Sequence, residues 1–396
     1  MGNDGSLTIF LDGRVDSSNA AQFEDRLSAE LKNAGATKLT LDCAEFEYVS
    51  SAGLRVLLKL ARRLQSLRVD NVSTDVYDIF DVTGFTQILD VHKALRKVDV
   101  SGLELLGEGA NGKVYRLTPD EMIKVFRPEL SLDDIEAERE ASRQAFLLGV
   151  PCAIPFDTVR CGKSYGTIYE LLNAVTLSER ITADPSTVGD CAEQSAKVLR
   201  SLHAIDVSQD MLPNAMHTFY GFLDGIADDF AEDENRELRR LLDAIPPANR
   251  FVHNDYHPKN VMYTNGELMI IDLGGAGSGN PLLDWIHTYS VFNLIGSGTG
   301  ARSDNEMSFI GITYGDCDRF WKVFAQTYFG TAERAERMST LLEPWGWLRY
   351  LSASMWHPRL PKEYHPMYAQ LMRNNVLAHA DQMVAALDEM MELLAL

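Results

Sequence analysis

The chain has few basic residues and no pattern of paired cysteines. Lys and Arg number 37 against 57 Asp and Glu, which gives a formal net charge of −20. A surface of this sign repels phosphate backbones and anionic lipids, so we expect neither nucleic acid nor a membrane as a partner. The five cysteines include no C-x-x-C pair. This argues against a zinc site or a disulfide framework and favours a reducing compartment.

Long apolar runs are also missing. The first residues, MGNDGSLTIFLDGR, have neither the basic segment nor the apolar segment of a secretory signal. No uninterrupted apolar stretch approaches the roughly 18 residues that cross a bilayer. We therefore expect a cytoplasmic protein. What remains is an ordinary globular composition, 45% hydrophobic and 24% charged, in a chain of 396 residues that is long enough for two or three domains.

The first hundred residues alternate between strand and helix patterns. We expect strands at 7–15, 38–44 and 68–73, and helices at 19–33, 52–64 and 77–83. Ser50 and Ser51 precede the second helix, and the hydroxyl of either one can cap it. This alternation predicts an α/β domain, a small sheet covered by helices, at 1–99.

The pattern changes after residue 99. VSGLELLGEG, NGKVYRL and EMIKVF read as three consecutive strands with glycine-rich turns, which is an antiparallel pattern. A charged helix follows from about 130, then strands within 157–171. The remainder is mostly helical, with strands at 251–275. We expect one α+β domain at 100–396, with an antiparallel-sheet lobe at about 100–173 and a mostly helical lobe at about 174–396.

Four separated segments of this second domain suit phosphoryl transfer. The first contains Gly107, Gly109 and Gly112, followed by Val114. It lies between two strands, whereas a dinucleotide-binding G-x-G-x-x-G lies between a strand and a helix. This context is typical of a loop whose backbone covers ATP phosphates.

The second segment is the apolar strand MIKVF with Lys124 at its centre. A lysine flanked by apolar residues needs an anionic partner, although the solvent face of a half-buried strand is the simpler alternative. The following helix, IEAEREAS, offers Glu136, Glu138 and Glu140. Glu136 and Glu140 share a helix face. We expect Glu140 to pair with Lys124, with Glu136 as the alternative, and the pair to order the α- and β-phosphates of ATP.

The third and fourth segments carry the acid–base and metal-binding residues. In HNDYHPKN (253–260), Asp255 can orient the attacking hydroxyl and accept its proton, and Asn260 can bind Mg²⁺. His253 is expected to brace this loop. Asp272 ends the apolar strand LMIID and is followed by Leu-Gly, which suits a second Mg²⁺ ligand.

Residues 102–396 resemble the aminoglycoside phosphotransferase and choline kinase group of the protein-kinase-like fold. HNDYHPKN is similar to that group's H-x-D-x-x-x-x-N, and IIDLGGAGSGNPLLDW is similar to its I-D segment, with Asp284 as a structural aspartate. The resemblance implies ATP and Mg²⁺ as cofactors and supports the roles given to Asp255, Asn260 and Asp272.

The same resemblance places an adenine-binding hinge at Glu170-Leu-Leu-Asn. Glu170 and Leu172 are the residues expected to lie against the nucleotide base. Only about a dozen residues separate Asp272 from Asp284, which leaves no room for the long activation segment of a protein kinase. The glycine loop GEGANGKVY, in contrast, is close to the protein-kinase pattern, so a protein substrate is an open alternative.

Residues 7–98 resemble the STAS domain of anti-sigma-factor antagonists, through LDGRVDSSNAAQFEDRL and LTLDCAEFEYVSSAGLRVLLKLARRL. The family's phosphoacceptor lies in D-S-[ST]-G-L. Here Ser51 keeps the acceptor position and Ser50 replaces the aspartate. A phosphate at Ser51 would lie at a helix N-terminus, which favours negative charge. The alternatives are that the serine only caps the helix, and that the domain is a passive protein-binding module.

Taken together, these patterns predict an ATP- and Mg²⁺-dependent phosphotransferase that acts on a small-molecule hydroxyl and is regulated by its STAS module. An acidic acceptor site would favour an amino-sugar or amino-alcohol. The alternative is a signalling kinase that phosphorylates a protein, either its own Ser51 or a partner of the STAS domain. A non-catalytic nucleotide binder is a third reading, opposed by the intact set Asp255, Asn260 and Asp272. An aromatic cluster can line an acceptor pocket or fill the core: Trp345, Trp347, Tyr350, Trp356 and His357.

Overall fold

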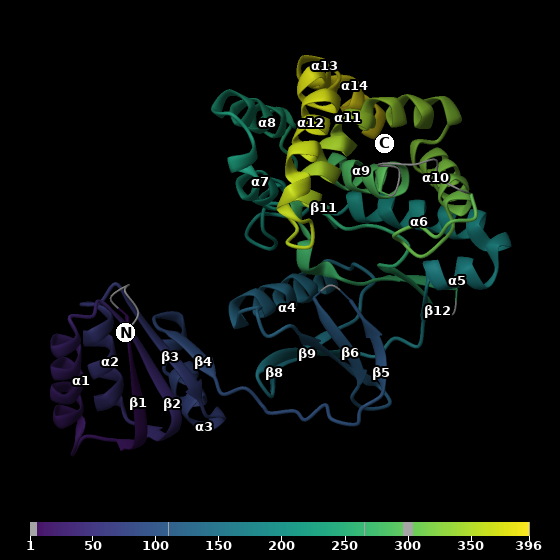
Figure 1. Cartoon of the computed structure of the whole chain (residues 1–396). Helices are drawn as coiled ribbons and strands as arrows, with labels where there is room; N and C mark the ends of the chain where they lie inside the picture. The colour runs from purple at the N-terminus through teal and green to yellow at the C-terminus, as the bar shows by residue number, and fades with distance from the viewer. Residues whose placement is uncertain (1–5, 110, 265, 296–303, 396) are drawn as a thin grey trace. The chain divides into compact units, whose positions relative to one another are not determined.

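The computed structural model describes residues 6–109, 111–264, 266–295 and 304–395 (Figure 1). The chain divides into two compact units. The first comprises Met1–Asp99 with Val159–Gly162, and the second comprises Val100–Thr158 with Lys163–Leu396. Each has a separate hydrophobic core. In the part of the chain that is described, no helix is both long enough and apolar enough to cross a membrane.

The first unit is a parallel four-stranded sheet with helices between its strands. The strands follow the order β1-β2-β3-β4, and every neighbouring pair is parallel. The elements are β1 (Ser6–Val15), α1 (Ala20–Ala34), β2 (Lys38–Val49), α2 (Ser51–Ala61), β3 (Ser66–Val72), α3 (Thr74–Val82) and β4 (Asp90–Lys93). The predicted α/β architecture is confirmed. Strand β2 runs five residues further than expected, through the mainly polar and aromatic segment EFEYV.

Amphipathic spacing explains how the helices of this unit pack. Helix α1 buries Phe23, Leu27 and Leu31, which recur every four residues and so lie on one face. In α2, a Cβ added to Gly53 would lie 2.7 Å from Val15 Cγ1 and 2.8 Å from Val49 Cγ2. Only glycine therefore allows α2 to approach the sheet this closely.

The second unit begins with an antiparallel five-stranded sheet in the order β5-β6-β7-β9-β8. Its elements are β5 (Leu105–Glu108), β6 (Gly112–Arg116), β7 (Glu121–Phe126), α4 (Leu132–Leu147), β8 (Pro155–Cys161) and β9 (Ser164–Glu170). The three expected consecutive strands and the charged helix are confirmed.

A mostly helical lobe follows, as predicted, with short strand pairs that carry the site (Figure 1). Its strands are β10 (Val175–Thr176), β11 (Arg250–Val252), β12 (Val261–Thr264), β13 (Glu267–Ile270) and β14 (Gly277–Gly279). Its helices are α5 (Leu177–Ala183), α6 (Val188–His203), α7 (Met216–Gly225), α8 (Glu232–Ala244), α9 (Leu282–Tyr289), α10 (Tyr314–Phe329), α11 (Ala332–Trp356), α12 (His365–Asn375), α13 (Ala380–Ala385) and α14 (Leu387–Leu394). Strand β11 pairs with β14, and β12 pairs with both β10 and β13.

An aromatic core fixes α9, the helix that supplies two residues of the site. The ring of Trp285 is fully buried, and its centroid lies 5.2 Å from that of Phe324, 4.8 Å from that of Tyr328 and 4.4 Å from that of Phe329. All three partners belong to α10. Large aromatic surfaces of this kind dominate core energetics, so α9 is held rigidly between its neighbours.

Candidate active site

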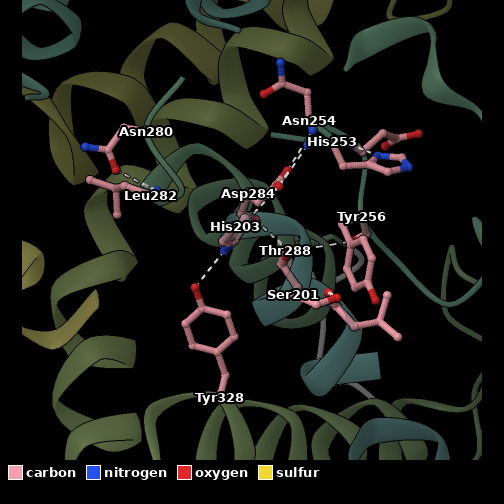
Figure 2. A network of polar contacts seen from close by, with 12 residues as sticks. Ser201, His203, His253, Asn254, Tyr256, Asn280, Leu282, Asp284, Thr288 and Tyr328 are labelled. Carbon is pink, nitrogen blue, oxygen red and sulfur yellow. Dashed lines mark hydrogen bonds and ion pairs between the residues drawn. The ribbon is translucent and has the colours of Figure 1, made fainter. Parts of the chain in front are cut away.

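One buried carboxylate holds the loop between β11 and β12 by hydrogen bonds to its backbone. Asp284, at the start of α9, is fully buried and accepts the backbone N–H of His253 at 2.9 Å and that of Asn254 at 2.7 Å. It also accepts a hydrogen bond from His203 Nε2 at 3.0 Å, and His203 Nδ1 lies 2.6 Å from the Tyr328 hydroxyl. Figure 2 shows Asp284 among these groups. The structural role expected for Asp284 agrees with this geometry.

The charge of Asp284 is stabilised by its hydrogen bonds. Burial alone would raise the pKa of the Asp284 carboxyl, but the hydrogen bond and charge of His203 and the loop N–H groups lower it below its usual value. An ionised carboxylate can accept several hydrogen bonds at once, which lets a single side chain fix two successive residues of the loop.

Asn254 is a second brace that the sequence analysis missed. Its backbone is left-handed, with φ of 65°, a conformation that Asn adopts more readily than most residues. Its side-chain amide donates to the carbonyl of Ala215 at 3.0 Å and to that of Gly275 at 2.9 Å. Asn254 therefore ties the loop to the turn that follows Asp272. His253, as expected, also braces the loop, because its Nε2 lies 3.1 Å from the carbonyl oxygen of Ile271.

Asp255 lies at the centre of this loop among amide and imidazole groups. Asn260 Nδ2 donates to Asp255 Oδ2 at 2.8 Å, and His287 Nε2 lies 3.1 Å from Asp255 Oδ1. His257 Nε2 is 3.6 Å from the same oxygen. Burial would raise the pKa of Asp255, but His257 and His287 outweigh it and lower the pKa below the usual value. Asp255 is therefore an ionised carboxylate, poised to accept a hydrogen bond from a hydroxyl group.

Burial disfavours protonation of His257 and His287, the two imidazoles that lie near the Asp255 carboxylate. Burial lowers the pKa of His257 to about 4, against the opposing charge of Asp255. The pKa of His287 is also lowered, again mainly by burial. His287 comes from α9, more than thirty residues after Asp255, and the sequence analysis did not single it out. Its placement three residues after Asp284 on the same helix was the available signal.

The expected partner of Lys124 was wrong. Lys124 Nζ lies 2.6 Å from Glu138 and 3.2 Å from Asp272, whereas Glu140 pairs with Arg143 on the helix surface. Glu136, the alternative, pairs with Arg139.

The helical phase of α4 explains this correction. Its buried residues include Ile135, Ser142 and Ala145, and the spacing of three and four residues places Glu138 on the same stripe. Glu136 and Glu140 lie on other faces. The apolar positions, not the spacing between glutamates, identify the side of the helix that faces the sheet.

Lys124 is held between two carboxylates. Burial alone would lower its pKa, but the charges of Asp272 and Glu138 raise it above its usual value. The pKa of Glu138 is raised as well, because burial and the neighbouring Asp272 outweigh the attraction of Lys124. Two anions stabilise the charged form of Lys124, whereas only one cation stabilises that of Glu138. The pKa values of both residues are therefore raised. The lysine stays protonated and available to an anionic ligand.

Asp272 and Asn260 lie at the open end of the β12–β13 hairpin. The backbone N–H of Ile271 donates to the Asn260 carbonyl at 3.0 Å, which makes the two proposed metal ligands near neighbours. Asp272 has a left-handed backbone with φ of 60°, a conformation that is rare outside glycine and recurs at functional sites. Its carboxylate is 40% exposed.

This donor set fits Mg²⁺. Mg²⁺ is bound by one or two protein oxygens together with waters and substrate phosphates, so a pair of ligands suffices. Asn260 uses its amide nitrogen on Asp255, at 2.8 Å, which leaves its carbonyl oxygen as the group for a metal. In the described part of the chain, no group of three or more His, Cys, Asp or Glu residues forms an all-protein metal cage.

The glycine loop joins β5 to β6, and its glycines differ in their surroundings. A Cβ at Gly107 or Gly109 would meet no atom within 4 Å, so these positions leave open space. A Cβ at Gly112 would collide with the Val125 carbonyl of β7, so glycine there serves the packing of two strands. Val114 pairs with Lys124 across the same two strands. The loop and the lysine are thereby fixed relative to each other.

The proposed hinge follows β9. The backbone N–H of Glu170 donates to the Ile154 carbonyl at 2.9 Å, so this donor is already used within the protein. The contacts of Glu170 and Leu172 with adenine stay a prediction.

The helix that follows Ser50 and Ser51 distinguishes the two serines. The Ser50 hydroxyl accepts the backbone N–H of Ala52 at 3.2 Å and is the N-cap of α2. Ser51 is exposed and is the first residue of the helix. The capping role therefore belongs to Ser50, and the Ser51 hydroxyl is left outside the cap.

The comparisons with known proteins agree with this geometry. Residues 102–306 match the model of the phosphotransferase enzyme family (APH), and residues 2–90 match a STAS domain model of the MlaB type. The chain belongs to the phosphotransferase enzyme family and is a kinase with an N-terminal STAS domain. The STAS part is 37% identical over 92 residues to BtrV of Bordetella bronchiseptica, a protein named as a candidate anti-sigma factor antagonist. That match covers 22% of this chain and 78% of BtrV.

Solved structures with a similar fold are kinases of small molecules. The ADP-bound aminoglycoside phosphotransferase APH(2'')-Ib is 15% identical, with 79% of this chain and 99% of that chain covered and a TM-score of 0.44. A choline/ethanolamine kinase family protein from Mesorhizobium loti is 17% identical, with 74% and 92% covered and a TM-score of 0.44.

Proposed function

We propose that the chain transfers the γ-phosphoryl group of Mg²⁺-bound ATP to the hydroxyl of a small molecule. The observation that carries this proposal is that Lys124 meets a group of polar residues around Asp272, which lies 148 residues later in the chain. Lys124 contacts Asp272 at 3.2 Å, Asp272 ends the hairpin that Asn260 begins, and Asn260 donates to Asp255 at 2.8 Å. A phosphate-binding cation, two metal ligands and a base thus form one continuous chain of contacts.

Each residue has a distinct role in this mechanism. The backbone at Gly107 and Gly109 covers the phosphates, and Lys124, held by Glu138, neutralises charge on them. Asn260 and Asp272 hold Mg²⁺, which supplies charge stabilisation to the transferring group when it is bound. Asp255 orients the acceptor hydroxyl and takes its proton.

The buried imidazoles have a supporting role. His287 lies 3.1 Å from Asp255 Oδ1, and Asn260 holds the other carboxylate oxygen. These contacts fix the carboxylate in one orientation and keep it ionised, which is what a positioned base needs. Phosphoryl transfer depends mainly on such positioning and on charge stabilisation.

The acceptor class and the domain organisation complete the proposal. The net charge of −20 supports a cationic acceptor of the amino-sugar or amino-alcohol type. The STAS domain, placed at 1–99, regulates the phosphotransferase domain at 100–396 through a protein partner. All five cysteines are buried thiols outside disulfides, which supports a reducing, cytoplasmic location.

The test replaces Asp255 by Asn and measures nucleotide affinity and ADP release separately. Because Asp255 acts on the acceptor, we expect ADP release to fall by roughly 10²–10⁴-fold while the affinity for ATP stays within about threefold. Asp381→Asn is the matched control, since that carboxylate is 98% exposed and forms a surface ion pair with Arg240. Unchanged turnover in Asp255→Asn would rule out the proposed role.

A second candidate function is autophosphorylation at Ser51. Ser50 already caps α2, so the exposed Ser51 hydroxyl is free to receive a phosphate. Arg55 Nε donates to the Ser51 carbonyl at 3.0 Å, which places a cation beside that phosphate. Helix N-termini and nearby arginines both stabilise phosphoserine.

Incubation of the full chain with Mg²⁺ and ATP tests this second function. Intact-mass measurement is expected to show one added phosphate, mapped to Ser51 by fragmentation and missing in both Ser51→Ala and Asp255→Asn. An unmodified wild type, or a phosphate that persists in Asp255→Asn, would exclude autophosphorylation by this site.

A further inference from the structure

The active-site lobe contains a buried arginine that the mechanism above does not use. Arg349 lies on α11 and is only 9% exposed. Its guanidinium carbon is 4.6 Å from the ring centroid of Phe222 and 5.6 Å from that of Phe219, both on α7. Its Nε atom is buried without a hydrogen-bond partner. The side chain is therefore packed against aromatic rings, with donor capacity left over.

Arg349 forms no ion pair with a carboxylate of the described residues. None of these residues brings an Asp or Glu oxygen within 4 Å of the Arg349 guanidinium, whereas Arg337 on the same helix pairs with Glu389 at 2.6 Å. The internal positions outside the description, 110, 265 and 296–303, contain no Asp or Glu. A buried cation without an anionic partner is costly, and arginine is seldom fully buried unless it is paired.

The position of Arg349 connects it to the acceptor. Its charge acts on His287 and is in turn attracted by Asp255, while burial lowers its pKa to about 10. Helix α11, which carries Arg349, packs against both α7 and α9. The nucleotide-binding groups Lys124 and Glu138 come from β7 and α4 instead. Arg349 thus lies on a helix that packs against α9, the helix that brings His287 to the proposed base, and not on the elements that hold the nucleotide-binding groups.

Arg349 and Asp255 would present opposite charges to an acceptor. His287 Nε2 and His257 Nε2 lie 3.1 Å and 3.6 Å from Asp255 Oδ1, so both imidazoles are placed toward the proposed base. Asp255 is anionic and would repel an anionic acceptor, whereas Arg349 remains protonated at neutral pH and would attract it. Guanidinium groups bind carboxylates and phosphates through paired hydrogen bonds, and these are stronger when water is excluded.

We propose that the acceptor is an anionic hydroxyl compound whose carboxylate or phosphate group is bound by Arg349 while its hydroxyl lies at Asp255. This inference rests on the proposed phosphotransferase function and opposes the cationic acceptor that the net charge favours. In the reaction, the acceptor oxygen bonds to the γ-phosphorus as the bond to the ADP oxygen breaks, and the hydroxyl proton goes to Asp255. The aromatic rings of Phe222 and Phe219 hold the guanidinium in place.

The experiment compares acceptors that differ in charge but share a hydroxyl framework. ADP release with Mg²⁺ and ATP is measured with glycerate, glycerol and serinol, with gluconate, glucose and glucosamine, and with glycerol 3-phosphate. We expect the anionic members to stimulate release and the cationic members not to. Carboxylate and phosphate members distinguish the two kinds of anion.

Variants of Arg349 separate recognition from structural support. In Arg349→Gln we expect the KM of an anionic acceptor to rise by roughly tenfold or more. We expect Arg349→Lys to restore part of this loss, since it restores the charge. The matched control is Arg337→Gln, on the same helix but in an exposed ion pair with Glu389. A merely structural arginine would change melting temperature and ATP affinity without changing the preference among acceptors.

Each remaining outcome decides between the two proposals. Preference of the wild type for glucosamine or serinol, or an unchanged acceptor profile in Arg349→Gln, would overturn the anionic acceptor and leave the phosphotransferase function intact. If no compound stimulates release, the melting temperature with Mg²⁺ and ADP is measured for the same panel. A rise with anions in the wild type but not in Arg349→Gln supports the inference, and no rise in either overturns it. Failure of the phosphotransferase function itself is read from Asp255→Asn.

Discussion

Lys124 shows how a single residue links the two lobes of the site. It contacts Glu138 from α4 at 2.6 Å and Asp272 from the hairpin at 3.2 Å. The first contact fixes the lysine relative to the sheet and the second fixes it relative to the proposed metal site. A lysine held between two anions is oriented before any nucleotide binds, so less ordering is needed when the phosphates arrive.

Substitution of Glu138 and of Glu140 tests whether Glu138 orients Lys124 for the nucleotide. Glu138→Ala leaves Lys124 with one partner, and we expect kcat/KM for ATP to fall by roughly 10²-fold. Glu140→Ala removes only a surface pair with Arg143 and is expected to change the same constant by less than about twofold. Steady-state kinetics with ATP varied measures both. Equal losses in the two variants would contradict the assignment of Glu138.

At the scale of elements, the catalytic loop depends on α9. Asp284 accepts two loop N–H groups and His203, while Trp285, the next residue, anchors the helix in the aromatic core. These adjacent residues therefore have different roles. Trp285 fixes α9 in the helical lobe, and Asp284 fixes the catalytic loop to α9.

Asp284→Ala is therefore expected to destabilise the protein. It leaves two backbone donors and one imidazole donor buried and unpaired, and we expect a loss of roughly 3–5 kcal/mol in unfolding free energy. Denaturant unfolding at neutral pH measures the loss. Asp381→Ala, at an exposed ion pair, should change stability by under about 1 kcal/mol. A small loss in Asp284→Ala would mean that the loop is held by other contacts.

The difference in unfolding free energy between the wild type and Asp284→Ala should depend on pH. The folded-state pKa of Asp284 is lowered below its usual 3.8, so its charge contributes stability that is present above pH 3.8 and is lost as the pH falls below that value. The stability difference between wild type and Asp284→Ala is therefore expected to narrow at low pH.

Element types were predictable from sequence, and the contacts between distant elements were not. The strand and helix patterns of both units appear at their expected places because apolar periodicity and glycine turns are local signals. Asp255, Asn260 and Asp272 could be predicted together because they lie on one hairpin and its flanking loop. Glu138 was not chosen as the partner of Lys124 because the prediction did not use the apolar residues of α4 to find which helix face is buried.

His287 and Arg349 were missed for a different reason. His287 contacts Asp255 from α9, and Arg349 is buried on α11, which packs against α9. Both helices lie far along the chain, and no spacing rule links these residues to Asp255. Arg349 interrupts the apolar segment WLRYL of α11, and a charge within such a segment is the one signal that local sequence offered. The sequence does not show that this arginine is buried between helices; that follows from the packing of α11 against α9 and α7.

At the scale of the whole molecule, each unit has a hydrophobic core of its own. The core of the first unit is built mainly from β1, β2, β3 and the helices α1, α2 and α3, and it shares no residue with the core of the second unit. Proteins with separate cores unfold in separate steps unless an interface couples them. We expect calorimetry of the full chain to resolve two transitions.

Ligand and core substitutions assign these transitions. The proposed site for Mg²⁺ and ATP lies in the second unit, so at a concentration about 100 times Kd these ligands should stabilise that unit alone, by about 2.7 kcal/mol. Leu41 and Leu351 are fully buried, one in each core, and each change to Ala is expected to cost roughly 2–5 kcal/mol. Leu41→Ala should lower the transition that ATP does not move, and Leu351→Ala the one that it does. A single transition lowered by both substitutions would show that the STAS domain and the kinase unfold as one cooperative unit. The proposed regulation would then act through a shared structure and not through an independent partner-binding module.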